Sequence, residues 1–117
     1  MKLIFLTLIS IFSTTAAAGT AGPAGPVNPF EGDAQRAEQG RSLFNQYCSH
    51  CHAPNAESPE RVRDVRRLRR RYADRMNEVF YRTVTEGRVD KGMPVWKGVV
   101  EDEVLWTIFT FIQSVQQ

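Results

Sequence analysis

The spacing of apolar residues predicts a helix towards each end of the folded part of the chain. From Asp33, a residue type that caps helix N-termini, apolar or small residues recur every three or four positions through Tyr47. The same spacing joins Leu105 to Val115, after three acidic residues that suit the positive end of a helix dipole. The pattern therefore predicts one helix ending near Tyr47 and another over about residues 101–115.

One position in the first predicted helix runs against helix propensity. Gly40 lies on the apolar face, although glycine destabilises a helix by about 1 kcal/mol relative to alanine. The usual compensation is a second helix that passes very close at that point. Phe44, one turn later, faces the same way and is expected to point into the core.

The middle of the chain combines an apolar stripe with a dense run of arginine. Eight of the twelve arginines fall between residues 61 and 75. The apolar residues beneath them have helical spacing: Val62, Val65, Leu68, Tyr72 and Met76. This pattern fits either one long helix or a loop followed by a helix. In both cases the helix continues to Gly87, a residue type that ends helices.

The first eighteen residues have the pattern of a secretory signal peptide. Lys2 precedes an apolar run from Leu3 to Phe12, and three small residues at 16–18 offer a cleavage site. The apolar run is too short for a transmembrane helix of about 20 residues, so we expect no membrane span after cleavage. Secretion to the periplasm is the resulting prediction, and a retained N-terminal anchor is the alternative.

Length and charge limit what the secreted chain can be. Cleavage would leave 99 of the 117 residues: a flexible Gly/Ala/Pro arm over 19–27 and one small domain over 28–117. The formal charge falls from +2 to +1 with the loss of Lys2, so charge does not indicate nucleic-acid binding. A chain of about 100 residues buries only a modest core.

The strongest chemical signal is the stretch Cys48-Ser49-His50-Cys51-His52. Two thiols three residues apart, followed at once by a histidine, form the C-x-x-C-H signature of covalent haem attachment. Each thiol adds to one vinyl group of the porphyrin, and His52 becomes the proximal ligand of the iron. These are the only two cysteines, so one haem c uses both and leaves no disulfide. We expect this haem to complete the small core, and the apoprotein to be poorly folded.

Two other chemistries use closely spaced cysteines, and neither fits as well. A thioredoxin-like redox motif requires a βαβ setting, and no alternating β-branched run surrounds these residues. A tetrahedral zinc site needs four ligands, and the chain's two cysteines and two histidines are too crowded to supply them. His50, between the two thiols, is expected to be a solvated bystander.

Three further residues are predicted to belong to the haem site. A sixth ligand is expected from Met93, which lies in a Gly/Pro-braced loop, whereas Met76 falls on the core face of a helix. The second ring nitrogen of His52 needs a hydrogen-bond partner, for which the Pro59 carbonyl is the first choice and a plain turn role the alternative. Trp96 is expected either to cover one haem edge, with its indole N–H near a propionate, or simply to pack in the core.

Four pieces of the sequence together carry a family resemblance: Gly40-x-x-x-Phe44-x-x-x-Cys48, Cys48-Ser49-His50-Cys51-His52, Gly92-Met93-Pro94-x-Trp96 and Thr110-Phe111-Ile112. In these pieces the chain resembles the small class I c-type cytochromes of bacteria. The resemblance implies an all-α class I cytochrome c fold, with three to five helices around one covalently attached haem. It also implies that the first and last helices cross at Gly40, where Phe44 and Phe111 pack together.

A narrower likeness concerns the electron donor. It is carried by Asn28-Pro29-Phe30-x-Gly32-Asp33, Arg63-Asp64-Val65-Arg66-Arg67-Leu68, Arg71-Tyr72 and Gly87-Arg88-Val89-Asp90-Lys91-Gly92-Met93-Pro94. These pieces look like cytochromes that accept electrons from quinoprotein (PQQ-dependent) alcohol dehydrogenases.

The expected function is one-electron transfer by a soluble periplasmic carrier, not enzymatic catalysis. The expected donor is a periplasmic dehydrogenase, and the acceptor is an oxidase or another cytochrome. Two alternatives remain. One is a cytochrome subunit permanently docked in a dehydrogenase complex, and the other is a haem peroxidase or gas-binding sensor, which would need an open distal site.

The arginine run has three possible uses. Clustered charge most often forms a solvated helix face. Arg63 and Arg71 are candidates to neutralise haem propionates. The other arginines could form a positive patch that attracts an acidic surface on the donor.

Overall fold

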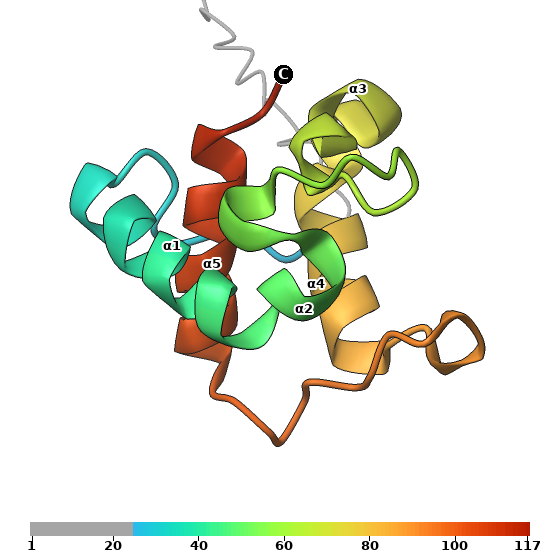
Figure 1. Ribbon diagram of the computed structural model, residues 1–117. Coiled ribbons are helices and arrows are strands. Elements are labelled where there is room, and N and C mark those ends of the chain that lie inside the picture. Colours follow the sequence, from blue (N-terminus) through green and yellow to red (C-terminus); the bar gives the residue numbers. More distant parts are fainter. Residues whose placement is uncertain (1–24) are drawn as a thin grey trace, which may run out of the picture.

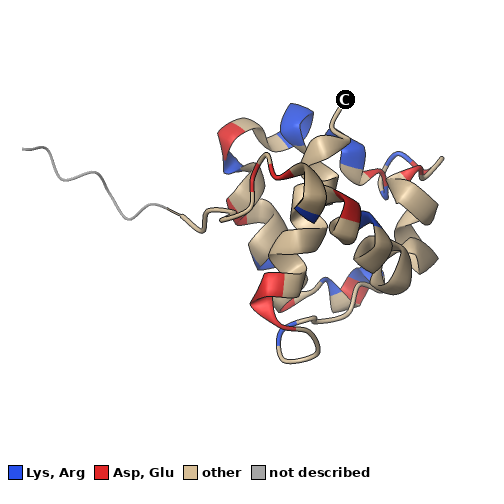
Figure 2. Cartoon of the chain, turned by 90° about the vertical axis from the view of Figure 1, so that its left-hand side faces the viewer, with Lys and Arg blue, Asp and Glu red and all other residues tan. Residues whose placement is uncertain are grey.

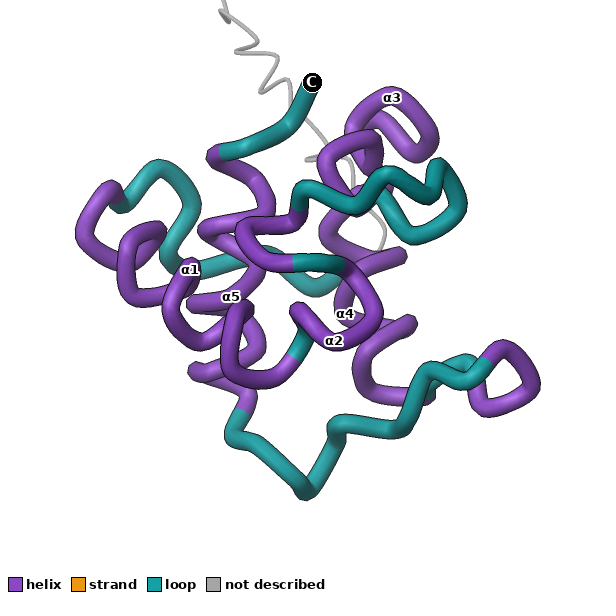
Figure 3. Tube along the Cα trace, viewed as in Figure 1, coloured by secondary structure: helices purple, strands orange, loops and turns teal. Residues whose placement is uncertain are grey.

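The computed structural model describes residues 25–117, and within this range the protein is built from helices and loops (Figures 1 and 3). The prediction of an all-α fold is confirmed: pairing of the extended type is limited there to two isolated bridges. The α-helices are α1 (Ala34–Tyr47), α2 (Ser49–His52), α3 (Leu68–Tyr72), α4 (Met76–Glu86) and α5 (Asp102–Ser114). Single 3₁₀ turns occupy Pro54–Ala56, Val65–Arg67, Ala73–Arg75 and Val89–Lys91.

The two long helices predicted from the apolar spacing are present. Asp33 caps α1, accepting a hydrogen bond from the backbone N–H of Arg36 at 2.9 Å. Glu101 precedes α5, and two acidic residues lie in its first turn, where they oppose the helix dipole. Gly87 ends α4, as its φ of 72° allows.

Helices α1 and α5 cross at Gly40 (Figure 1). A Cβ atom added to Gly40 would overlap the backbone carbonyl of Thr107 and lie 3.0 Å from Cβ of Phe111. Beside this point the rings of Phe44 and Phe111 pack with centroids 5.4 Å apart and planes tilted by 59°. The crossing therefore takes the form that the family resemblance implied, and it accounts for the glycine inside α1.

Helix α5 is the centre of the core. Nine consecutive residues, from Leu105 to Gln113, are buried, so the helix is enclosed on nearly all sides and not on one apolar face alone. On one side Phe109 stacks on Phe80 of α4, with ring centroids 4.1 Å apart. The polar residues among the nine bond within the protein: Thr110 and Gln113, for example, both accept from the buried amide of Asn28.

The arginine-rich segment forms short pieces and not one long helix. A turn leads into the 3₁₀ turn Val65–Arg67, then α3, a second 3₁₀ turn and finally α4. Val62, expected in the apolar stripe, is 83% exposed, because the turn that contains it precedes the first helical residue. Val65 and Leu68 do pack against the core, and Met76 belongs to it.

Some predictions about the N-terminal part concern residues outside the described range. The signal peptide at 1–18 and most of the arm at 19–27 fall there, so these boundaries and the domain limits at 28–117 stay predictions. Within residues 25–117, no helix has both the length and the apolar character needed to cross a membrane.

Candidate functional site

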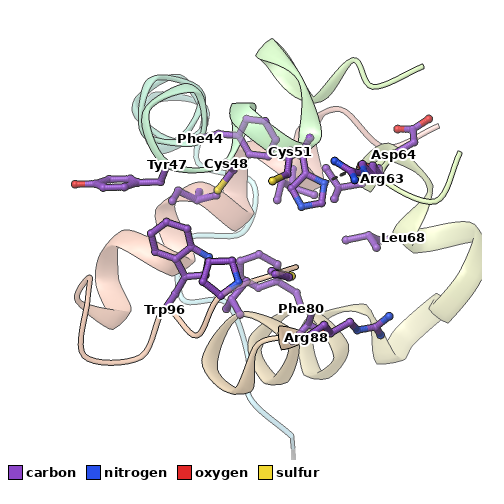
Figure 4. Close-up of a pocket in the computed structure, with 18 of the residues that line it drawn as sticks. Phe44, Tyr47, Cys48, Cys51, Arg63, Asp64, Leu68, Phe80, Arg88 and Trp96 are labelled. Carbon is purple, nitrogen blue, oxygen red and sulfur yellow. Dashed lines mark hydrogen bonds between the residues drawn. The ribbon is translucent and has the colours of Figure 1, made fainter. Parts of the chain in front are cut away.

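A cavity of about 730 Å³ opens between two walls of the protein. Figure 4 shows Phe44, Cys48 and Cys51 on one wall, with Phe80, Trp96 and Arg88 across the space. Side chains of α5, among them Leu105, Ile108 and Ile112, also line it. The volume lies in the range of about 300–1,000 Å³ that is typical of cofactor sites.

The C-x-x-C-H stretch forms one tight turn at the edge of this cavity. The backbone N–H of Cys48 donates to Phe44 at the end of α1, and those of Cys51 and His52 donate back to the Cys48 carbonyl at 3.2 and 3.0 Å. All three side chains line the same cavity. Because the turn is closed by these hydrogen bonds, the two sulfurs and the imidazole are presented together to whatever the cavity holds.

The two thiols have different surroundings. Cys48 is half-buried and Cys51 is exposed, and neither is in a disulfide. Burial, with a smaller contribution from Cys51, raises the pKa of the Cys48 thiol to about 12, so this thiol is protonated at neutral pH. In an addition to a vinyl group the sulfur would join one vinyl carbon and the thiol hydrogen the other, so that each cysteine would end as a thioether.

His52 is oriented by a hydrogen bond that the sequence did not predict. Its Nδ1 lies 2.8 Å from the backbone carbonyl of Arg63, the dashed contact beside Arg63 in Figure 4. With Nδ1–H donated to this carbonyl, Nε2 is left free to bind a metal. His50 is exposed, in keeping with a bystander role, although it also touches the edge of the cavity.

This hydrogen bond corrects the expectation for Pro59. Three non-glycine residues with positive φ turn the chain just after His52: Ala53, Asn55 and Ala56. The chain path set by this turn carries Pro59 past the imidazole, and the carbonyl that reaches Nδ1 belongs to the residue four positions later. Pro59 is also absent from the residues that line the cavity.

Met93 lines the cavity from a loop that is closely tied down. Its backbone N–H and carbonyl both bond to Arg88, at 3.0 and 2.9 Å, across a turn completed by Gly92 in the left-handed region. The alternative thioether, Met76, is 5% exposed in the core and does not line this cavity. Of the two methionines, Met93 is therefore the one positioned to bind the iron of a group in the cavity. Its ligation stays a prediction.

Trp96 also lines the cavity. Its backbone N–H donates to Val84 at 2.9 Å, and its ring meets Tyr47 edge to face with centroids 5.8 Å apart. Figure 4 shows this ring facing the wall that carries the cysteines. Both predicted roles, covering a haem edge and packing in the core, are compatible with this position.

Four cationic residues line the cavity: Arg63, Arg71, Arg88 and Lys91. Arg63 and Arg71 were predicted from the sequence to lie near the haem propionates, whereas Arg88 and Lys91 were not. Arg63 pairs with Glu60 at 3.2 Å, and Arg71 donates to the backbone carbonyl of Arg61. A cavity with more cations than carboxylates on its lining suits an anionic group such as a haem propionate.

The residues that line this cavity would fit a covalently bound haem. The apolar lining, the two thiols, a histidine with its second nitrogen fixed and a thioether all belong to one cavity. Cys48, Cys51 and His52 would hold the group from one wall, and Met93 from the other.

A protein-family model described as cytochrome C oxidase, cbb3-type, subunit III matches residues 35–112. This range covers α1 except for its first residue, all of α2 to α4, the loop that carries Met93 and Trp96, and most of α5. The comparisons found no match among curated proteins and none among solved structures.

Proposed function

The chain belongs to the family described as cytochrome C oxidase, cbb3-type, subunit III, a family of class I cytochrome c domains, and from this we propose that it is a soluble periplasmic one-electron carrier. Family membership indicates a haem-based electron carrier, and the spacing of Cys48 and Cys51 is that of one covalent haem. The periplasmic location rests on the signal-peptide pattern of residues 1–18.

One observation carries the proposal: the attachment turn and Met93 line the same cavity. The bound haem would supply the exchange of one electron. The protein's own part is to hold it, to exclude water and to keep the sixth position closed to other ligands. A spectrum that is low-spin in both oxidation states, with no carbon monoxide binding, would support a carrier. A high-spin iron that binds carbon monoxide would contradict it.

Changing Met93 to alanine should leave the haem covalently attached, because the thioethers do not depend on it. The reduction potential should fall and carbon monoxide should bind, since a Met/His pair favours the reduced iron and closes the sixth position. The measurement is the weak Met–iron charge-transfer band together with redox titration. Met76→Ala is the matched control, because Met76 is buried in the core and outside the cavity. Loss of the band in the control alone would show that the wrong methionine was assigned.

For the electron donor we propose a quinoprotein alcohol dehydrogenase, and for the acceptor an oxidase or another cytochrome. The support is the likeness of pieces such as 28–33 and 87–94 to cytochromes that serve such dehydrogenases. The test is stopped-flow reduction of the ferric protein by a purified dehydrogenase of this class with its alcohol. A rate that rises with the concentration of both proteins supports the assignment. If no electron transfer occurs, the assignment of a quinoprotein alcohol dehydrogenase as donor is wrong.

The structure divides the arginine run into two groups. Arg66 and Arg67 are paired with Asp64, and Arg75 with Glu78. By contrast, Arg69 and Arg70 are exposed on α3, and the ion pairs of residues 25–117 do not include them. Basic positions lie beside the C-terminus in Figure 2, and the backbone N–H of Gln117 donates to the carbonyl of Arg66 in this run at 2.9 Å. The second group is therefore available to a partner.

Arg69→Gln with Arg70→Gln should slow reduction by the dehydrogenase at low salt and flatten its salt dependence. Electrostatic attraction raises the association rate and is screened over about 10 Å at 0.1 M salt. The measurement is the second-order rate across a salt titration. Arg41→Gln with Lys97→Gln is the control, because it removes the same charge from α1 and from the loop before α5. Equal salt dependence of the rate for the Arg69→Gln/Arg70→Gln variant and the wild type would show that these arginines only form a solvated helix face.

A further inference from the structure

The carbonyl that orients His52 belongs to a segment without helical hydrogen bonds. Arg63 lies in a turn, closed by its own N–H donating to Glu60 at 2.9 Å, and its carbonyl lies 2.8 Å from Nδ1 of His52. A backbone carbonyl in a turn keeps its direction only if the residues on either side are fixed. The structure shows what fixes them.

Asp64, the next residue, is buried and holds this segment through hydrogen bonds to Arg66 and Arg67. It is 4% exposed, and both of its carboxylate oxygens are in use. Oδ1 accepts from the backbone N–H and the Nε of Arg66, at 3.1 and 2.9 Å. Oδ2 accepts from Nη2 of Arg66 and from Nε of Arg67, both at 3.2 Å. These bonds, those of Arg66 above all, hold the pKa of Asp64 below its usual range, so the carboxylate is charged at neutral pH.

The same segment is held from its other side by the residues after α5. Nε2 of Gln116 donates to the carbonyl of Val65 at 2.8 Å, and its Oε1 accepts from the backbone N–H of Arg69 at 2.8 Å. The backbone N–H of Gln117 donates to the carbonyl of Arg66 at 2.9 Å. Residues 64–69 are thus fixed at both ends, by a carboxylate on one side and an amide on the other.

We propose that Asp64 and Gln116 are positioning residues that hold the Arg63 carbonyl against His52 and thereby set the reduction potential of the haem. A carbonyl that accepts Nδ1–H makes the imidazole a stronger donor to the iron, which favours the oxidised state. Removing the hydrogen bonds of Asp64 or Gln116 should weaken the bond between the Arg63 carbonyl and His52, and should raise the reduction potential of the haem. The inference rests on the proposed ligation by His52.

The first test is Asp64→Asn, which keeps the shape of the side chain and removes its charge. We expect a higher potential and faster hydrogen exchange of the His52 Nδ1 proton, followed by NMR in the reduced protein. The increase in exchange should be about tenfold or more, the order expected when a charged hydrogen bond is lost. Asp90→Asn is the control, because it removes an equal charge from an exposed residue near the cavity-lining Arg88 and Lys91 without touching the turn that contains Arg63. This control should leave the exchange rate unchanged.

The second test removes no charge at all. Gln116→Ala deletes the amide contacts to Val65 and Arg69 and leaves Asp64 intact. A shift of potential and of Nδ1–H exchange in the same direction as in Asp64→Asn would identify positioning, not the electric field of a carboxylate, as the cause. This variant also keeps the proposal testable if Asp64→Asn does not fold.

Two results would overturn the inference. One is an Asp64→Asn protein whose potential shifts no more than that of Asp90→Asn, with Nδ1–H exchange as in the wild type. The other is a Gln116→Ala protein that matches the wild type in both measurements. The spectrum of the wild-type protein separates these failures from a failure of the proposed function: if it shows His/Met ligation, only the positioning role falls.

Discussion

A protein in which Cys48 and Cys51 are both changed to alanine should not fold to a compact monomer. Without attachment, the cavity of about 730 Å³ loses the group that is expected to fill it. Its apolar lining, which includes Leu105, Ile108 and Ile112, would then face water, at a cost of about 25 cal/mol per Å² of apolar surface. A domain has a total stability of only about 5–15 kcal/mol. Loss of the group that this lining packs against should therefore remove most of the stability.

The measurement is circular dichroism and gel filtration of the variant, compared with the attached protein. His50→Ala is the control, because it lies in the same turn but leaves both thiols and His52 in place. The control should attach haem and unfold cooperatively. Recovery of a haem-free double variant as a monomer with a cooperative thermal transition would show that the haem does not organise this fold.

The helices could be predicted because local signals agree with the packing. Asp33 and Gly87 occupy the cap positions that their residue types favour. The apolar spacing located α5 but marked only part of its buried surface, since nine consecutive residues of this helix are buried. The attachment turn was predictable for a different reason. Its chemistry needs two thiols and a histidine at fixed spacing, and no other residue type can replace them.

The path of the chain from Ala53 to Asp64 could not be predicted. It depends on three positive φ values at residues that are not glycine, which a residue type does not signal. For this reason the carbonyl beside His52 was assigned to Pro59 and not to Arg63. Val62 was placed in the core by its spacing, although the helix that the spacing assumed begins only after it.

Asp64 shows what a closer view of the sequence could have found. It is the one carboxylate between Arg61 and Arg71, in a segment that otherwise carries only positive charge. A single acid among so many arginines is a natural centre for ion pairs, and the structure buries it with two of them. Arg66 and Arg67 therefore help to fix the turn, whereas Arg69 and Arg70 face solvent.

Changing Gly40 to alanine should destabilise the protein strongly while leaving the haem attached. Alanine alone would favour α1 by about 1 kcal/mol over glycine. The new Cβ, however, would overlap the Thr107 carbonyl oxygen and press on Phe111. Because the obstructing atom is backbone, no side-chain rotation relieves the overlap, and the two helices must move apart. Overpacking costs about 1–3 kcal/mol and occasionally more, and we expect the upper end of this range.

Thermal unfolding of the holoprotein measures the effect. A loss of about 3 kcal/mol corresponds to a fall in Tm of more than ~10 °C for a domain of this size. Gln39→Ala is the matched control, because it adds no atoms and lies on the exposed side of the same helix, so its Tm should change little. The spectrum should stay close to that of the wild type in both variants, since the crossing lies outside the cavity lining. A Gly40→Ala protein as stable as Gln39→Ala would mean that α1 and α5 do not meet at this residue, and that the packing between the first and last helices is looser than the structure shows.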